Sequence, residues 1–284
     1  MRHEIRKEVR RKFCSKSKDV MTSQNANIKT NTVVGLILSL LSLLASVLGL
    51  FGRVYRDSDW EASQLKGQDA VTILVALGLL LFLFFDTEKT KLILTGLFGY
   101  LAYTYVTYVF GPKLNPLFLV YIALMSISIF GLVLLFRQIG RFNLSPTSGW
   151  IFRLSSVYLM AVALLLSVLW LADIVGNLKG KPLLANPTGE PLVTVYALDL
   201  GFVIPAMIYG GIQVLRKKFW GYILTGVMLV KSTTLGFALM AMALALHIRG
   251  HGLDLFLAVF WSVLALVGLG LSLLYLRAVQ FNGA

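Results

Sequence analysis

The sequence predicts an all-α protein, a polytopic transmembrane helical bundle of about eight spans with both termini in the cytoplasm. Hydrophobic residues make up 57% of the 284 residues and charged residues only 14%, whereas soluble domains contain about 25% charged residues. The mean hydropathy is +0.80, and the apolar residues are gathered in long segments. No single soluble core absorbs so much apolar sequence in a chain of this length, so the lipid bilayer is the predicted environment.

Hydropathy windows of about 19 residues define the individual spans. The second is the shortest and begins at Ala70 or slightly earlier, near Gln68, which leaves Gly52–Asp69 as a long outer connection. A seven-helix bundle is the main alternative. The eight candidate spans are Val33–Phe51, Ala70–Phe85, Leu92–Phe110, Leu117–Phe136, Ile151–Val175, Val193–Leu215, Phe219–Leu246 and Leu253–Leu276.

The formal net charge of +13 is distributed as in a membrane protein. If the N-terminus is cytoplasmic, about 18 of the 26 Lys and Arg residues lie inside and about 7 outside, as the positive-inside rule requires. The predicted orientation is therefore N-in and C-in, and nucleic acid is not an expected partner. The inner basic groups are Arg2–Lys18, Lys89 with Lys91, Arg137 with Arg141, Arg216–Lys218 and Arg277.

The chain divides into three predicted parts: a basic cytoplasmic tail (1–32), the bundle (33–276) and a short cytoplasmic C-terminal tail (277–284). The first tail is rich in basic residues and poor in apolar ones, which is typical of disorder. It is interpreted either as an over-extended start before Met21 or as a polybasic patch that binds anionic lipid. The one cysteine, Cys14, excludes an intrachain disulfide.

A weak internal similarity appears at an offset of about 130 residues. The sequence Ile-Leu-Thr-Gly occurs at 93–96 in the third span and again at 223–226 in the seventh. The same offset roughly superposes the second span on the sixth. A 4+4 parallel repeat about an axis along the membrane normal would explain this, although a four-residue apolar match is also common by chance in membrane sequences.

Two ionisable residues, Asp199 and Lys231, lie within the sixth and seventh spans. A charge near the centre of a membrane helix costs about 2.5–3.5 kcal/mol or more, so it seldom persists without a partner or a function. At about 1.5 Å per residue, Asp199 lies about 9 Å below the outer boundary and Lys231 about 12 Å below it. Consecutive antiparallel helices then place the two at one height, and an ion pair in the outer half of the bundle is predicted.

Two interpretations of this pair are open. It is either a buried salt bridge that fixes helix register, or the lining of an outward-facing polar cavity for a solute, an ion or a proton. Pro205 follows Asp199 within two turns, and a proline there kinks the helix and frees backbone carbonyls. Tyr100 and Tyr103 are interpreted either as packing residues or as residues that face Asp199, and in a cavity Tyr103 with Thr194 would form a hydrogen-bonding wall.

Other polar residues near the outer side carry weaker predictions. Asp173 and Asp254 are expected to be solvated charges at helix ends. His247 and His251 are four residues apart with Asp254 three further, which resembles a metal-binding face, but intervening glycines interrupt the helix. No metal site, catalytic residue or cofactor is predicted, and because no catalytic motif is present, an enzyme is disfavoured.

Parts of the sequence resemble an uncharacterised family of bacterial polytopic membrane proteins. The resemblance lies in Tyr105–Tyr121, Tyr196–Pro205 and Trp220–Tyr222, and rests mainly on Asn115-Pro116 and Asp199-Leu200-Gly201. It covers roughly the third to seventh spans. It implies a multi-pass protein of the bacterial inner membrane, and it implies no activity or substrate.

Two functional hypotheses follow. The first is a carrier or binding protein for a small solute or ion, with Asp199 as anionic ligand or proton acceptor and Lys231 as its charge partner. The second is a non-transporting sensor, assembly partner or scaffold, in which the pair is structural. The candidate binding residues of the first are Asp199, Lys231, Tyr103, Thr194 and Pro205.

Overall fold

The computed structural model of this chain describes residues 32–139, 143–146, 149–181, 183, 192–252 and 254–282. The predicted N-terminal tail lies outside these residues except for Thr32, and so does Cys14. Most of the proline-rich segment between the fifth and sixth spans, 184–191, also lies outside them.

Eight helices in the described residues are long and apolar enough to cross a membrane, which confirms the predicted all-α, multi-span class. The sixth span is made of three consecutive pieces: α6, a π-helical turn (η1) and α7. In chain order the elements are the first helix Thr32–Phe51, α2 Asp59–Phe82, α3 Glu88–Phe110, α4 Phe118–Ile139, β1 Asn143–Pro146, α5 Gly149–Leu178, α6 Val193–Leu198, η1 Asp199–Val203, α7 Ile204–Leu215, α8 Phe219–Ile248, α9 Leu255–Ala278 and β2 Val279–Asn282.

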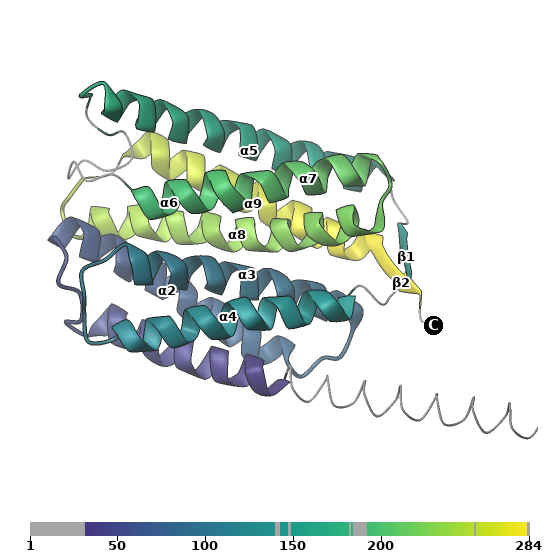
Figure 1. Ribbon diagram of the computed structural model, residues 1–284, viewed down its shortest axis with the longest axis horizontal. Helices are drawn as coiled ribbons and strands as arrows, with labels where there is room; N and C mark the ends of the chain where they lie inside the picture. The colour runs from purple at the N-terminus through teal and green to yellow at the C-terminus, as the bar shows by residue number, and fades with distance from the viewer. Residues whose placement is uncertain are drawn as a thin grey trace, which may run out of the picture.

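The helices form one bundle in which each half of the chain gathers on its own side (Figure 1). One apolar cluster is built mainly by the first four spans and a second by the last four. Helices α3 and α8 lie against each other between the two halves, and α8 also packs against α2, α7 and α9. The two residues predicted to carry function, Asp199 and Lys231, therefore lie close to this central boundary.

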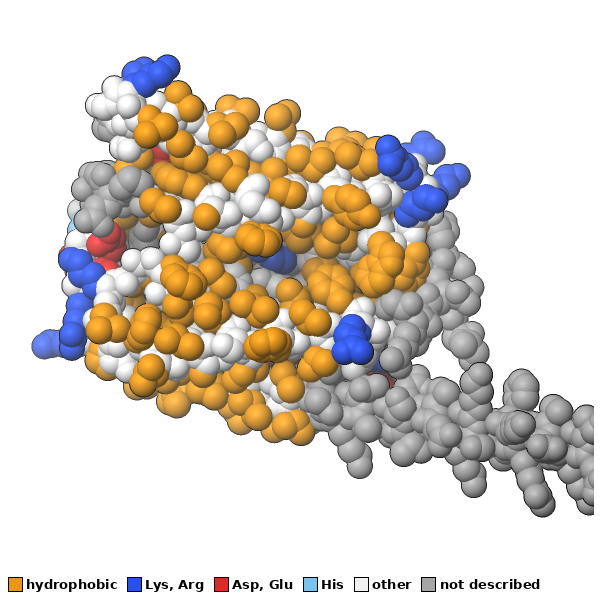
Figure 2. Space-filling model, viewed as in Figure 1, with side chains coloured by type: hydrophobic (Ala, Val, Ile, Leu, Met, Phe, Trp, Pro, Cys, Tyr) orange, Lys and Arg blue, Asp and Glu red, His pale blue; other side chains and the backbone are white. Residues whose placement is uncertain are grey.

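The outer surface of the bundle is apolar along the middle of its length. Figure 2 shows hydrophobic side chains across this part of the visible face, with basic side chains gathered at its two ends. Large apolar residues of the spans, such as Leu74, Leu119 and Leu266, are well exposed. Because lipid tails rather than water are the natural neighbours of such a surface, this exposure supports contact with a bilayer.

The predicted start of the second span, Ala70, is wrong. Helix α2 begins at Asp59, where Ser58 and Glu61 form a capping box, so much of the predicted 52–69 connection is helical. The additional turns contain Asp59, Glu61 and Asp69, which lower the average hydropathy of this segment. Such an average does not reveal which face of a helix is directed into the protein, and Asp69 is buried.

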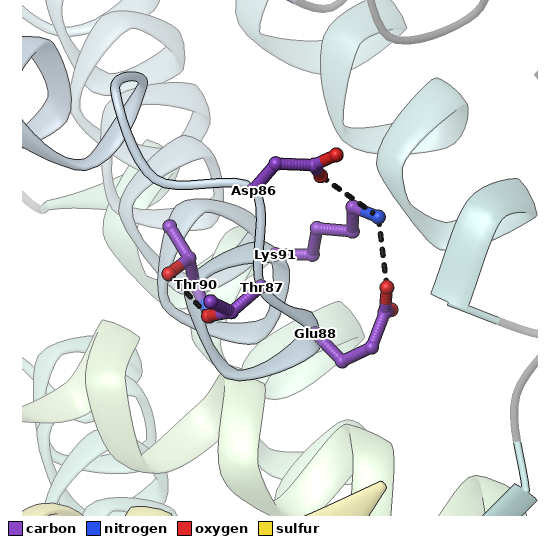
Figure 3. A network of polar contacts seen from close by, with 5 residues as sticks. All are labelled: Asp86, Thr87, Glu88, Thr90 and Lys91. Carbon is purple, nitrogen blue, oxygen red and sulfur yellow. Dashed lines mark hydrogen bonds and ion pairs between the residues drawn. The ribbon is translucent and has the colours of Figure 1, made fainter. Parts of the chain in front are cut away.

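The connection between α2 and α3 is held by a small polar network (Figure 3). Thr87 caps α3 by accepting a hydrogen bond from the Thr90 backbone N–H at 3.1 Å. Lys91 forms ion pairs with Asp86 at 3.1 Å and with Glu88 at 2.8 Å. These contacts pair the charges of Lys91, Asp86 and Glu88 and cap the start of α3, which accounts for the network.

Two short strands join the C-terminal residues to the bundle. Strand β2 pairs antiparallel with β1, which lies between α4 and α5, with Asn143 opposite Asn282 and Pro146 opposite Val279. The residues predicted as a tail (277–284) therefore include the end of α9 and an ordered strand. The pairing also places the α4–α5 connection and the C-terminus at the same end of the bundle (Figure 1). This agrees with the even number of spans that lie between these two segments in the chain.

Candidate functional site

Asp199 begins the π-helical turn η1 in the middle of the sixth span. The backbone N–H of Ile204 bonds to the carbonyl of Asp199, five residues earlier, and Pro205 follows at the start of α7. Proline has no N–H to donate, so a carbonyl of the preceding turn is left without its usual helical partner. Such π turns are rare and frequently occur at functional sites, and here the predicted irregularity near Pro205 is present.

The Asp199 carboxyl group is buried and only half satisfied. The residue is 3% exposed. Its Oδ2 accepts a hydrogen bond of 2.9 Å from the indole Nε1 of Trp170 on α5, while its Oδ1 is buried and has no hydrogen-bond partner in the described part of the chain. A buried carboxylate oxygen without a donor is energetically costly, so this oxygen marks a place where a ligand or a proton would be favourable.

Lys231 lies near the middle of α8 and is also buried, at 4% exposure. Its side chain passes Gly99 of α3, where a Cβ atom would lie 3.8 Å from the Lys231 Cγ. Its Nζ lies 4.1 Å from the centre of the Tyr103 ring. Within residues 32–282 as described, Nζ has no hydrogen-bond partner, so the ammonium group rests on the face of an aromatic ring.

The predicted direct ion pair between Asp199 and Lys231 is therefore wrong in its geometry. The two charges are near enough to interact electrostatically, and Tyr103 interacts with both of them. The sequence placed the correct helices side by side, but it did not show that Lys231 would contact an aromatic ring from α3. The result is a carboxylate oxygen and an ammonium group that are buried together and not bonded to each other.

Thr194 of the predicted wall, and Tyr100, form their hydrogen bonds elsewhere. The Thr194 hydroxyl donates to the backbone carbonyl of Phe110, at the end of α3, over 3.2 Å. The Tyr100 hydroxyl shares a hydrogen bond of 3.0 Å with Thr72 on α2, so Tyr100 is directed away from Asp199. Of the predicted hydrogen-bonding wall, only Tyr103 is at the site.

Asp173 is buried, at 2% exposure, and so it is not the solvated helix-end charge that the sequence suggested. Its carboxylate accepts a hydrogen bond of 2.6 Å from the Tyr196 hydroxyl. The Tyr196 ring in turn contacts Trp170, with 5.3 Å between ring centres. Asp173 therefore supports Trp170, the residue that donates to Asp199.

Among the described residues, the two histidines near the end of α8 belong to no group that could hold a metal ion. The Nε2 of His251 lies 2.8 Å from the Oδ2 of Asp59, at the start of α2, and Asp254 caps α9 by accepting from the backbone N–H of Leu257. The described residues contain no group of three His, Cys, Asp or Glu side chains that could hold a metal ion. The His251–Asp59 contact instead links the α8–α9 connection to α2.

A second buried carboxylate, Asp69 on α2, was not among the predicted site residues, because its segment was predicted to be a connection between spans. It is 1% exposed, and it accepts hydrogen bonds from the hydroxyls of Tyr55 and Tyr108. One feature of the sequence could have indicated Asp69. Asp69 and Asp199 are 130 residues apart, which is the offset that separates the two Ile-Leu-Thr-Gly segments at 93 and 223.

The site thus consists of an oxygen of Asp199 that has no partner among the described residues, the Lys231 ammonium and the Tyr103 side chain, which interacts with both. Trp170 donates to Asp199 and is itself supported by Tyr196 and Asp173. Comparison of the whole chain with protein family models, curated protein sequences and solved structures finds no match in any of the three.

Proposed function

We propose that this chain is a multi-pass protein of the bacterial inner membrane that binds or carries a small solute or ion at a polar site formed by Asp199, Lys231 and Tyr103. Both termini are on the cytoplasmic side and the site is in the outer half of the membrane. The observation that carries the proposal is the pair of unsatisfied groups, Asp199 Oδ1 and Lys231 Nζ, buried within two adjacent spans.

A structural ion pair would be expected to reduce the cost of burying its two charges by direct hydrogen bonding. Here each charge keeps free bonding capacity, although the Tyr103 ring stabilises the buried ammonium by about 2 kcal/mol or more. A ligand that offered a donor to Asp199 and an acceptor to Lys231 would satisfy both. The π turn at η1 supports the same proposal because it provides irregular backbone at the depth of the carboxylate.

Figure 2 shows a basic side chain in a hollow near the middle of the apolar face, away from the basic residues at both ends. Lys231, near the middle of α8, is itself buried, at 4% exposure. A charge at this depth in a lipid-facing protein is by default a functional candidate.

The alternative is a sensor, assembly partner or scaffold that transports nothing. The observation in its favour is that Trp170 and Tyr103 already tie α5 and α3 to the charged residues of η1 and α8. In that case the same contacts serve only to hold the four elements in register. The two proposals predict similar stability and different binding.

The first test is a thermal-shift screen of the detergent-purified protein against inorganic ions, amino acids, other small metabolites and lipids. We expect at least one compound to raise the melting temperature of the wild type, because a ligand that binds only the folded state at 100 times its Kd adds about 2.7 kcal/mol of stability. Asp199→Asn should abolish that shift, since the amide lacks the charge, while leaving the protein folded and inserted.

The matched control is Asp254→Asn. Asparagine is as good a helix N-cap as aspartate, so this variant should keep both the fold of α9 and the ligand shift. A ligand that stabilises wild type and Asp199→Asn equally would place binding away from the site, and the proposal would then be wrong. A well-folded wild type that responds to no compound would favour the scaffold.

A further inference from the structure

The Asp69 carboxylate is held mainly by phenol hydroxyls. Tyr55, in the connection between the first helix and α2, donates to its Oδ2, and Tyr108 on α3 lies 3.2 Å from its Oδ1. No Lys or Arg among the described residues forms an ion pair with it, although the charge of Lys66, one turn earlier on α2, acts on it electrostatically. A carboxylate buried in this way is stabilised by taking up a cation.

The packing around Asp69 limits how large that cation can be. The carboxylate lies directly on Gly49 of the first helix, where a Cβ atom would overlap Oδ2 and lie 2.6 Å from the Tyr55 hydroxyl. The other side is filled by tyrosine rings, with 5.1 Å between the centres of Tyr108 and Tyr121. A proton needs no additional volume, whereas a solute or a coordinated metal ion does.

The Tyr108 hydroxyl has two acceptors within reach, the backbone carbonyl of Leu65 at 3.1 Å and Asp69 Oδ1 at 3.2 Å. When Asp69 is ionised, Tyr108 can donate to it. When Asp69 is protonated on Oδ2, the carboxylic acid can donate to the Tyr55 oxygen while Tyr108 donates to the carbonyl of Leu65. Both protonation states of Asp69 are therefore satisfied by the same atoms with only a rotation of hydroxyl hydrogens.

We infer that Asp69 is a reversible proton-binding site, separate from Asp199, and that Tyr55 connects it to water at the neighbouring end of the bundle. In the uptake step the O–H bond of Tyr55 breaks as the Asp69 Oδ2–H bond forms, and Tyr55 takes a replacement proton from water. The net reaction transfers one proton from water to Asp69, and release follows the same steps in reverse.

Tyr55 is suited to this role because it is half-buried and lies outside the spans. Burial raises the pKa of Tyr55 far above the usual value for a phenol, and the negative charge of Asp69 makes a second, smaller contribution in the same direction. It therefore remains a neutral donor and acceptor and does not become a phenolate. The carboxylate is the group that changes its charge.

Apart from Lys66, the remaining titratable groups near Asp69 among the described residues are phenols. From α3 and α4, two of them have buried hydroxyls without a hydrogen-bond partner among the described residues: Tyr105 and Tyr121. Their rings are stacked, with 6.2 Å between centres, and both contact Tyr108. The full set of ionisable neighbours is Tyr55, Lys66, Tyr100, Tyr105, Tyr108 and Tyr121. With the phenols neutral, Asp69 is the buried group that can titrate.

The test is infrared difference spectroscopy of the full-length protein in lipid bilayers, titrated from about pH 9 to about pH 4. We expect the C=O band of a protonated carboxylic acid to appear as the pH falls, to be missing in Asp69→Asn and to persist in Asp199→Asn. That second variant separates this inference from the proposed solute site. A wild-type difference spectrum with no titrating band that depends on Asp69 would overturn the inference.

If Asp69→Asn does not fold, Asp69→Glu provides the assignment. In protein labelled with ¹³C at the aspartate carboxyl, the Asp69 band carries the isotope shift in the wild type, and the corresponding band of the unlabelled glutamate in the variant does not. Tyr55→Phe tests the route: after a pH jump its band should appear at least about tenfold more slowly, since the proton-transferring hydroxyl is gone. Equal rates in Tyr55→Phe and wild type would exclude Tyr55 as the connection.

Discussion

Gly67→Ala should destabilise the protein by about 2 kcal/mol, although alanine is a better helix former than glycine. Gly67 lies where α2 crosses α8, and a Cβ atom there would be 2.6 Å from both the carbonyl oxygen of Ala241 and the Cα of Met242. These are backbone atoms and cannot rotate away. Overpacking costs about 1–3 kcal/mol, and we expect the upper end, reduced by the gain of about 1 kcal/mol in helix propensity.

The same helix offers the control. Gly78 has no atom within 4 Å of the position that a Cβ would take, so Gly78→Ala should be neutral or slightly stabilising. Melting temperatures and the monodisperse fraction after extraction in one detergent would be compared for the two variants. Equal behaviour would mean that α2 and α8 do not approach as closely as the structure shows.

The Gly67 contact matters for function because it fixes the two helices that carry Asp69 and Lys231. Asp69 follows Gly67 by two residues, and Lys231 lies about three turns before Ala241 on α8. A displaced α2 would move Asp69 away from Tyr108, which stands on α3. We therefore expect Gly67→Ala to weaken the titrating Asp69 signal as well as the fold.

Hydropathy was sufficient to predict eight spans because each segment has to supply enough apolar surface for lipid. It failed at α2, whose polar residues are directed into the protein: Gln68 donates to Thr104 and Asp69 accepts from Tyr108. A polar residue that bonds inside the bundle and one that is solvated in a loop have the same hydropathy. Only the tertiary partners distinguish the two, and these are far away in sequence.

The site was predicted in part for a similar reason. Chain connectivity made the sixth and seventh spans neighbours, and helix rise put Asp199 and Lys231 at one height. The predicted salt bridge was wrong because of a residue from a third helix: Tyr103 on α3 contacts Lys231 and also interacts with Asp199. The indole of Trp170 comes from α5. Contacts between helices that are not consecutive depend on rotation about each helix axis, which one sequence does not determine.

The predicted 4+4 repeat stays a prediction, with observations on both sides. Each half has its own apolar cluster, and the carboxylates Asp69 and Asp199 obey the 130-residue offset. The two repeated glycines, Gly96 and Gly226, both lie where α3 meets α8. However, Gly96 contacts Val230 and Gly226 contacts Leu92. If a true two-fold axis related the two halves, the contact of Gly96 with Val230 would be repeated as a contact of Gly226 with position 100. Because Gly226 contacts Leu92 instead, the two helices are displaced along each other by about one turn.

Neutralising one of the two central charges should cost more stability than neutralising both. Lys231→Met leaves Asp199 without its neighbouring positive charge, and Asp199→Leu leaves the Lys231 ammonium with only the Tyr103 ring. Breaking a buried charge pair on one side costs about 3–5 kcal/mol, whereas replacing both partners by apolar residues is often neutral. We expect each single variant to melt well below the wild type and the double variant to recover most of the loss.

Lys218→Met, at the exposed start of the same helix α8, is the control and should leave the melting temperature unchanged. Losses that simply add in the double variant would mean that the two charges do not interact. The recovered double variant then separates the two proposed functions. A scaffold needs only the packing of α3, α5, η1 and α8, so the double variant should still bind its partners. A solute site needs the charges themselves, so the double variant should be folded and inserted, yet show no thermal shift with the ligand that stabilises the wild type.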